Sequence, residues 1–200
     1  DLIAGPSEIV VVANQRNNPN WVASDLMAQA EHDINAQAIL ITNSKFFAEK
    51  VVSQINNLSS KLSKQRIIKE SLKRNGLIIL VDDIKKCIKI INHIAPEHLH
   101  LHVKEKNKIL PEINNAGSIF LGEYSTEAFG DYIAGTNHIL PTSGSAKFSS
   151  GLSVYDFMKR TSIINIDKKG YNKLNQHTQQ MAEIEDLLAH KLSVKIRQNK

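Results

Sequence analysis

The chain of 200 residues has one cysteine, few aromatic residues and no long hydrophobic run. Its single cysteine, Cys87, excludes an internal disulfide and a zinc site built from several thiolates, and it is typical of a reducing compartment. The longest apolar runs, 9–13 and 77–81, are far too short to span a membrane. The chain does not open with the basic and apolar regions of a signal peptide. We therefore expect a cytoplasmic protein with no membrane partner.

The net charge of +5 invites a nucleic-acid interpretation, but the distribution of the charge argues against it. Lysine and arginine are spread along the whole chain, with only short local runs such as 104–108. Aromatic residues make up 6% of the chain and do not interleave with the basic residues, as a stacking platform for bases would require. We expect no nucleic-acid partner.

Short β-branched segments alternate with longer helical patterns up to Pro141. The strands are continuously apolar, which indicates burial on both faces, and the alternation favours a mostly parallel sheet covered by helices. The sequence therefore predicts an α/β fold with an incomplete Rossmann-like sheet flanked by helices. The strands are expected at 9–13, 37–42, 77–81, 99–103 and 118–121, and the helices at 19–32, 44–58, 61–75 and 83–93.

The composition changes after Pro141, where 142–151 is rich in serine and glycine and reads as a linker. A short helix at 155–159 and a strand-like segment at 162–166 are expected next, then a helix over 171–195 with one apolar stripe. Such a helix cannot bury its stripe alone and must pack on the main domain or on another subunit. We predict a Rossmann-like α/β domain over 1–141, and a linker with a mainly helical dimerisation tail over 142–200.

The chain begins without a methionine and enters a turn and a strand within its first residues. Natural domains seldom begin so abruptly. We interpret the chain as a fragment or as a truncated homologue of a longer protein.

Four segments carry residues able to do chemistry. Gln29 and His32 are three residues apart and project from one face near a helix end, a pattern that more often marks polar surface than a metal site. Glu97 and His98 follow Pro96 at the turn into a strand, where two such groups can relay protons near neutral pH. His100 and His102 alternate with apolar residues, which indicates the polar face of a half-buried strand.

The third segment, 129–138, is the most specific local pattern in the chain. Gly130 and Gly135 permit tight backbone turns, so that Asp131 and His138 could converge on one site. On the terminal helix, Glu185 and His190 are both able to reach one ligand, although a lone histidine there is more often surface.

The order of these and other segments resembles that of the histidinol dehydrogenase family, over essentially all 200 residues. The match corresponds to the C-terminal portion of a longer family chain. One departure is Ala95 before Pro96, where family members usually have glycine. The segments that carry the resemblance are Gly5-Pro6-Ser7-Glu8, Ala23-Ser24-Asp25-Leu26, Gln29-Ala30-Glu31-His32, Ala95-Pro96-Glu97-His98-Leu99, Ala116-Gly117-Ser118-Ile119-Phe120-Leu121-Gly122, Gly130-Asp131-Tyr132, Gly135-Thr136-Asn137-His138-Ile139-Leu140-Pro141 and Ala189-His190-Lys191.

The resemblance implies a zinc-dependent oxidoreductase that converts L-histidinol to L-histidine with NAD. It implies Glu97 and His98 as the acid/base pair. Zinc would be held by Gln29, His32, Asp131 and His190, and the substrate would be contacted by these four, by His98, and by Ser7, His138 and Glu185. Glu185 and His190 would come from the partner subunit of a homodimer. Most of the residues that contact NAD would lie N-terminal to Asp1.

Three functions remain open at this point. The chain is part of an active oxidoreductase, or a shortened homologue that binds zinc and an imidazole ligand without oxidising it, or a nucleic-acid-binding protein. The third rests on net charge alone.

Overall fold

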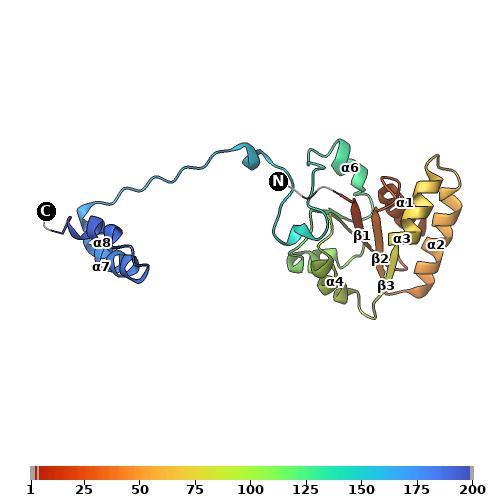
Figure 1. Ribbon diagram of the computed structural model, residues 1–200. Helices are drawn as coiled ribbons and strands as arrows, with labels where there is room; N and C mark the ends of the chain where they lie inside the picture. Colours follow the sequence, from red (N-terminus) through yellow and green to blue (C-terminus); the bar gives the residue numbers. More distant parts are fainter. Residues whose placement is uncertain (1–2, 4, 199–200) are drawn as a thin grey trace. The chain divides into compact units, whose positions relative to one another are not determined.

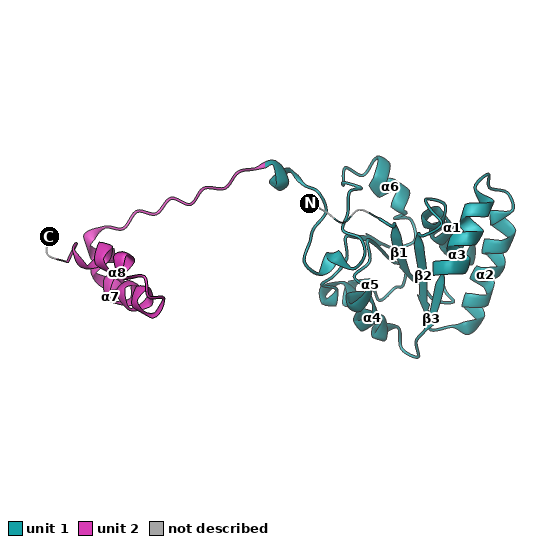
Figure 2. Ribbon diagram, viewed as in Figure 1, with its two compact units in different colours: residues 1–157 teal, residues 158–200 magenta. Residues whose placement is uncertain are grey.

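The computed structural model describes residue 3 and residues 5–198. The chain divides into two compact units, residues 1–157 and residues 158–200 (Figure 2). The first unit holds a parallel sheet with its helices, and the second holds a pair of helices.

The sheet has five parallel strands in the order β3-β2-β1-β4-β5, of which β1, β2 and β3 are labelled in Figure 1. β1 lies at the centre, and the chain adds β2 and β3 on one side before it crosses to add β4 and β5 on the other. This is the strand order of Rossmann-type sheets, and it confirms the predicted fold class. The strands are β1 (Glu8–Val12), β2 (Gln37–Thr42), β3 (Leu77–Leu80), β4 (His98–Leu101) and β5 (Ser118–Leu121).

Apolar side chains on the two faces of the sheet form two separate cores. Ile9, Val11 and Leu40 pack under α1 (Pro19–Ala30) and α2 (Lys45–Ser59), and α3 (Gln65–Asn75) packs on α1. The alternate residues of the same strands, such as Val10, Val12 and Ile39, pack against α4 (Cys87–Ile94) and α5 (Lys106–Ile109). Successive residues of a strand face opposite sides of the sheet. A continuously apolar strand therefore contributes side chains to both cores.

Local signals fix where the first helices begin. The side chain of Asn18 accepts a hydrogen bond from the N–H of Asn20, and Pro19 occupies the first turn of α1, as the sequence predicts. The hydroxyl of Ser44 accepts one from the N–H of Phe47 at the start of α2. The remaining elements of this unit are η1 (Ile84–Lys86), η2 (Leu110–Glu112), α6 (Glu127–Tyr132), η3 (Ser145–Lys147) and η4 (Val154–Phe157).

The second unit contains α7 (Lys168–Ile184) and α8 (Leu188–Lys195). The single helix expected over 171–195 is wrong, because the chain breaks at Asp186, whose φ is 56°, and the hydroxyl of Tyr171 then donates to the carbonyl of Val194 at 2.7 Å. The strand-like segment at 162–166 is also wrong: it lies outside any strand and its isoleucines are exposed. Among residue 3 and residues 5–198, no helix has the length and apolar character needed to cross a membrane.

Candidate active site

The turn from α4 into β4 places Glu97 and His98 at the amino end of an interior strand. Ala95 ends α4 in the left-handed conformation, with φ 53°, and Pro96 prevents the helix from continuing. His98 begins β4 beside Ile9 of β1. Both side chains are nearly inaccessible, with Glu97 6% and His98 4% exposed. The pair is thus held rigidly and away from bulk water.

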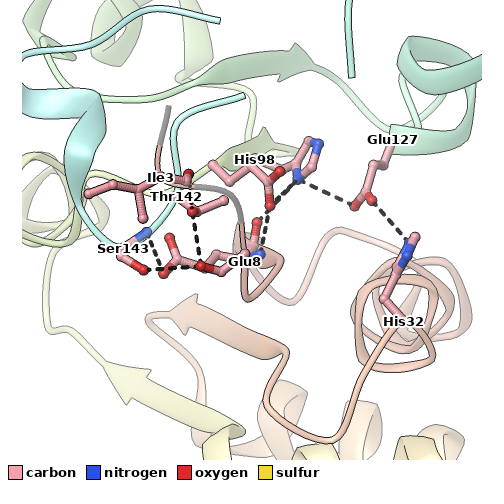
Figure 3. A network of polar contacts seen from close by, with 9 residues as sticks. Ile3, Glu8, His32, His98, Glu127, Thr142 and Ser143 are labelled. Atoms are coloured by element: carbon pink, nitrogen blue, oxygen red, sulfur yellow. Dashed lines mark hydrogen bonds and ion pairs between the residues drawn. The ribbon is translucent and has the colours of Figure 1, made fainter. Parts of the chain in front are cut away.

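The main chain of Glu8, at the start of β1, joins these two residues. Oε2 of Glu97 accepts a hydrogen bond from the N–H of Glu8 at 2.9 Å, and Nδ1 of His98 lies 3.2 Å from the Glu8 carbonyl oxygen (Figure 3). Nδ1 is also 3.6 Å from Oε2 of Glu97. The other ring nitrogen, Nε2, is buried and has no hydrogen-bond partner in the part of the chain that the structure describes. It is therefore the atom that His98 can offer to a reacting group.

Gln29 of α1 and Glu127 of α6 close the opposite side of the site. Gln29 is fully buried, and with its amide nitrogen turned inward it donates to Oε2 of Glu127 at 2.9 Å and to the Glu8 carbonyl at 3.2 Å. The same nitrogen lies 3.1 Å from Nδ1 of His98. Oε1 of Glu127 is 3.9 Å from Nε2 of His32, whose side chain is 49% exposed. A path of polar atoms thus runs from the surface at His32 to the buried pair (Figure 3).

Burial sets the proton affinities of this site. Burial, reinforced by neighbouring carboxylates with Asp131 the strongest, raises the pKa of Glu127 to about 8. Burial also raises the pKa of Glu97 to about 7, and it lowers the pKa of His98 to about 4. Near neutral pH the imidazole is therefore uncharged and Glu97 is close to its midpoint. A neutral base beside a carboxyl group that gains and loses its proton near pH 7 is suited to acid/base catalysis.

A second polar group lies further along β4, on the same face as His98. His100 and His102 lie under Asp25 of α1, and Oδ2 of Asp25 is 3.5 Å from Nδ1 of His100 and 3.1 Å from Nε2 of His102. The expectation of a half-buried strand is wrong here, because α1 covers this face and all three side chains are buried. Together, Asp25, His100 and His102 form the Asp25 cluster.

Comparison with known proteins assigns the chain to a family. A family model described as histidinol dehydrogenase matches residues 1–198. The chain belongs to the histidinol dehydrogenase family. It is 47% identical over 199 residues to histidinol dehydrogenase from Aquifex aeolicus, covering 100% of this chain and 47% of the relative. It is 49% identical over 197 residues to that from Hydrogenovibrio crunogenus, covering 98% of this chain and 46% of the relative.

A solved structure agrees with this assignment. The crystal structure of histidinol dehydrogenase from Elizabethkingia anophelis matches with a TM-score of 0.93 at 40% identity, covering 100% of this chain and 46% of that one. The chain therefore spans about half the length of the histidinol dehydrogenases it matches.

The structure gathers part of the site that the resemblance to histidinol dehydrogenases implies. Gln29, His32, Glu97 and His98 lie in one polar network. Asp131 lies one turn after Glu127 on α6, and its charge raises the pKa of the buried carboxyl groups. The glycine expected to form a turn before it, Gly130, lies inside the helix instead.

Among the described residues, the side chains of Ser7 and His138 make no hydrogen bond or ion pair with this network, and the remaining implied residues belong to the second unit. Ser7 immediately precedes β1, and its carbonyl accepts from the N–H of Gln37 at 2.9 Å. His138 is exposed and makes no hydrogen bond or ion pair with residue 3 or residues 5–198. Glu185 ends α7 and His190 lies on α8, both exposed within the unit 158–200.

Two carboxyl groups of the site escaped prediction from sequence. In the sequence, Glu8 belongs to a family segment and nothing marks it as a site residue, although its backbone holds both members of the acid/base pair. The sequence predicts no helix over 127–132, so no pattern marks Glu127; the helix α6 places Glu127 and Asp131, four residues apart, on one face.

Proposed function

We propose that this chain forms the metal-binding and proton-transferring part of an NAD-dependent histidinol dehydrogenase. The reaction is the four-electron oxidation of L-histidinol to L-histidine through histidinal, a step of histidine biosynthesis. Besides family membership, one observation carries the proposal: neutral His98 lies beside Glu97 with its raised pKa, buried at one site with Gln29.

The donor set of the site supports a zinc ion. Glu97 and Glu127 are buried close to one another and to Asp131, and each carboxyl group raises the pKa of a neighbour. A divalent cation would offset that crowding of negative charge. We assign Gln29, His32 and Asp131 as ligands, with His190 as the fourth. When bound, zinc would orient and polarise the substrate without taking electrons itself.

His98 would act in the first oxidation. If Nδ1 carries the proton that is shared with the Glu8 carbonyl, Nε2 keeps a free lone pair. The alcohol then loses its O–H proton to Nε2 and its C–H hydride to NAD⁺, which leaves the aldehyde. The low pKa of His98 keeps the ring unprotonated at neutral pH, which leaves Nε2 available as the proton acceptor.

Glu97 would act in the second oxidation. Water gives a proton to the Glu97 carboxylate as its oxygen adds to the aldehyde carbon, which forms the singly deprotonated hydrate. Loss of a second hydride to a second NAD⁺ then gives the carboxyl group. A carboxyl group with its pKa near 7 can take up and release that proton without leaving the working pH range.

The remaining assignments concern the substrate and the assembly. We infer that Ser7, His138 and Glu185 contact the substrate together with the zinc ligands. Glu185 and His190 would come from the tail of a second subunit in a homodimer. The apolar side chains of Met181, Ile184 and Leu188 are exposed within their own unit, which supports a partner surface for this tail. Most of the NAD site would lie outside the chain.

Two preparations test the proposal: the 200-residue chain, and the same chain fused to the N-terminal part of the Aquifex aeolicus relative. Each is loaded with zinc, and NADH formation from L-histidinol is followed. We expect two NADH per histidinol from the fusion and no turnover when His98 is replaced by Gln. A folded, zinc-loaded fusion that forms no NADH would refute the proposed activity.

The second candidate is a homologue that binds zinc and an imidazole ligand but does not oxidise it. The observation in its favour is that Gln29, His32 and His98 lie in one polar network within this chain, so ligand binding there would not need the NAD site. Calorimetry with L-histidinol and L-histidine separates the two functions. Zinc-dependent binding of either ligand, combined with an inactive fusion, would favour this candidate.

A further inference from the structure

We propose that Asp25, His100 and His102 form a second metal site, for Zn²⁺ or a similar first-row divalent ion, distinct from the assigned active-site ligands. The three side chains offer two imidazoles and one carboxylate, a donor set suited to Zn²⁺ and its neighbours. The inference does not depend on the proposed catalytic function, because none of the three is an implied zinc ligand.

The fold brings the side chains of Asp25, His100 and His102 together. His100 and His102 are two residues apart on the chain at β4, so both face α1, where Asp25 lies above them. One ligand atom from each residue lies within 4.8 Å of the other two. Neighbouring ligands of a tetrahedral zinc ion are about 3.3 Å apart when the metal–ligand bonds are about 2.0 Å. The Asp25 separations of 3.5 and 3.1 Å bracket that spacing.

The donor atoms are buried, and within the described part of the chain they contact one another and no polar partner outside the cluster. Asp25, His100 and His102 are 6%, 0% and 5% exposed. Oδ2 of Asp25 and both ring nitrogens of each histidine lack a well-formed hydrogen bond within the described part of the chain. Buried polar atoms are almost always satisfied in folded proteins, so an orphaned set that converges on one point indicates a missing ligand. A single cation would satisfy one atom of each residue at once.

Charge favours a cation at this point. Burial alone would raise the pKa of Asp25, but its contacts with His100 and His102 outweigh burial and lower it, so the carboxylate is ionised. Burial lowers the pKa of His100, which keeps its ring neutral. Ionised carboxylate and neutral imidazole are the forms that bind metal.

A cavity lies beside the cluster. His102 lines a cavity of about 320 Å³ at the carboxyl ends of β1, β4 and β5. Asn17 forms part of its wall and donates to the carbonyl of His102 at 3.2 Å and to Oε1 of Glu123 at 2.8 Å. The ring of His102 is itself buried, so a metal ion would reach the cluster only when this wall moves, and three protein ligands leave a coordination position for water or a small ligand.

The test is metal binding by the zinc-free 200-residue chain, with Co²⁺ as a spectroscopic probe and Zn²⁺ as competitor. Replacing His32 by Ala removes an assigned active-site ligand, so any tight site left in that background belongs elsewhere. We expect His32→Ala to bind one Co²⁺ per chain with a tetrahedral absorption spectrum. Adding His102→Gln should weaken this binding at least about 100-fold. The exposed His93→Ala is the matched control and should change nothing.

Two results would overturn the proposal. One is a His32→Ala chain that binds no metal, and the other is a His32→Ala/His102→Gln chain that binds as tightly as His32→Ala. Should the double variant fail to fold, X-ray absorption on the zinc complex of His32→Ala decides the matter. Two imidazoles and a carboxylate support the site, and any other ligand set refutes it. Neither readout uses NAD, so failure here is distinct from failure of the proposed dehydrogenase.

Discussion

The raised pKa of Glu127 predicts an unusual dependence of stability on pH. Its carboxyl group titrates at about 8 in the folded chain against 4.5 as the ordinary value. Between these pH values the folded state holds the extra proton, so the free energy of unfolding falls as pH rises. A difference of roughly 3.5 pKa units corresponds to up to about 5 kcal/mol lost by pH 8. Glu127→Gln cannot ionise and should therefore be the more stable chain at high pH.

Urea unfolding of the zinc-free chain, followed by circular dichroism between roughly pH 5 and pH 9, measures this effect. His98 contributes in the opposite direction below its ordinary pKa, because its folded pKa of about 4 makes stability rise with pH from about 4 to 6.5. That contribution is common to both chains, so the difference between Glu127→Gln and wild type isolates Glu127. We expect the difference to grow steadily with pH, and the exposed Glu112→Gln to show no such growth. A difference that stays flat with pH would show that Glu127 is not buried as a neutral acid.

Three further predictions concern packing, hydrogen bonding and catalysis. A Cβ on Gly130 would lie 2.8 Å from the ring of Phe120, so Gly130→Ala should destabilise the chain by about 1–3 kcal/mol, measured as a lower urea midpoint. The buried Ser71 hydroxyl donates to the carbonyl of Ala36 at 2.9 Å, so Ser71→Ala should cost about 1 kcal/mol in the same assay, and an unchanged midpoint would contradict that bond. In the active fusion, Glu97→Gln should slow oxidation of histidinal more than that of histidinol, with zinc content unchanged; equal slowing of both steps would contradict a role confined to the second.

The sheet was predictable because most of its strands are continuously apolar. Residues 37–42 and 118–121 match the expected strands, since a continuous β-branched or apolar run is hard to satisfy except inside a sheet. The same reasoning failed at 162–166, where the β-branched run has no neighbouring strand to pair with. Strand propensity measures how well a residue fits a pleated sheet surface, and it does not show whether a neighbouring strand is available for pairing. The break at Asp186 was invisible for a related reason, because its neighbours are all compatible with a helix.

The site was predictable only where residues are adjacent in the chain. Glu97 and His98 are neighbours in the sequence, so the pattern alone indicates an acid/base pair. Gln29, His32 and Asp131 were expected in the site only from the family resemblance. Contacts that arise from packing left no local pattern: the backbone of Glu8 enters the site because β1 runs beside β4.

The histidines of β4 show what distinguishes residues that a sequence pattern treats alike. His98, His100 and His102 fall on one face by the period of two of an extended chain, and alternation with apolar residues would ordinarily place that face in water. Instead α1 covers it, so each ring must find a partner or a ligand. His98 finds the backbone of Glu8, which leaves its Nε2 for a reacting group. Within the described part of the chain, the other two contact only Asp25, whose one carboxylate cannot satisfy four ring nitrogens. His98 is therefore a candidate for proton transfer, because one ring nitrogen has a partner and the other is free. His100 and His102 form a candidate metal site, because one carboxylate leaves their ring nitrogens short of partners.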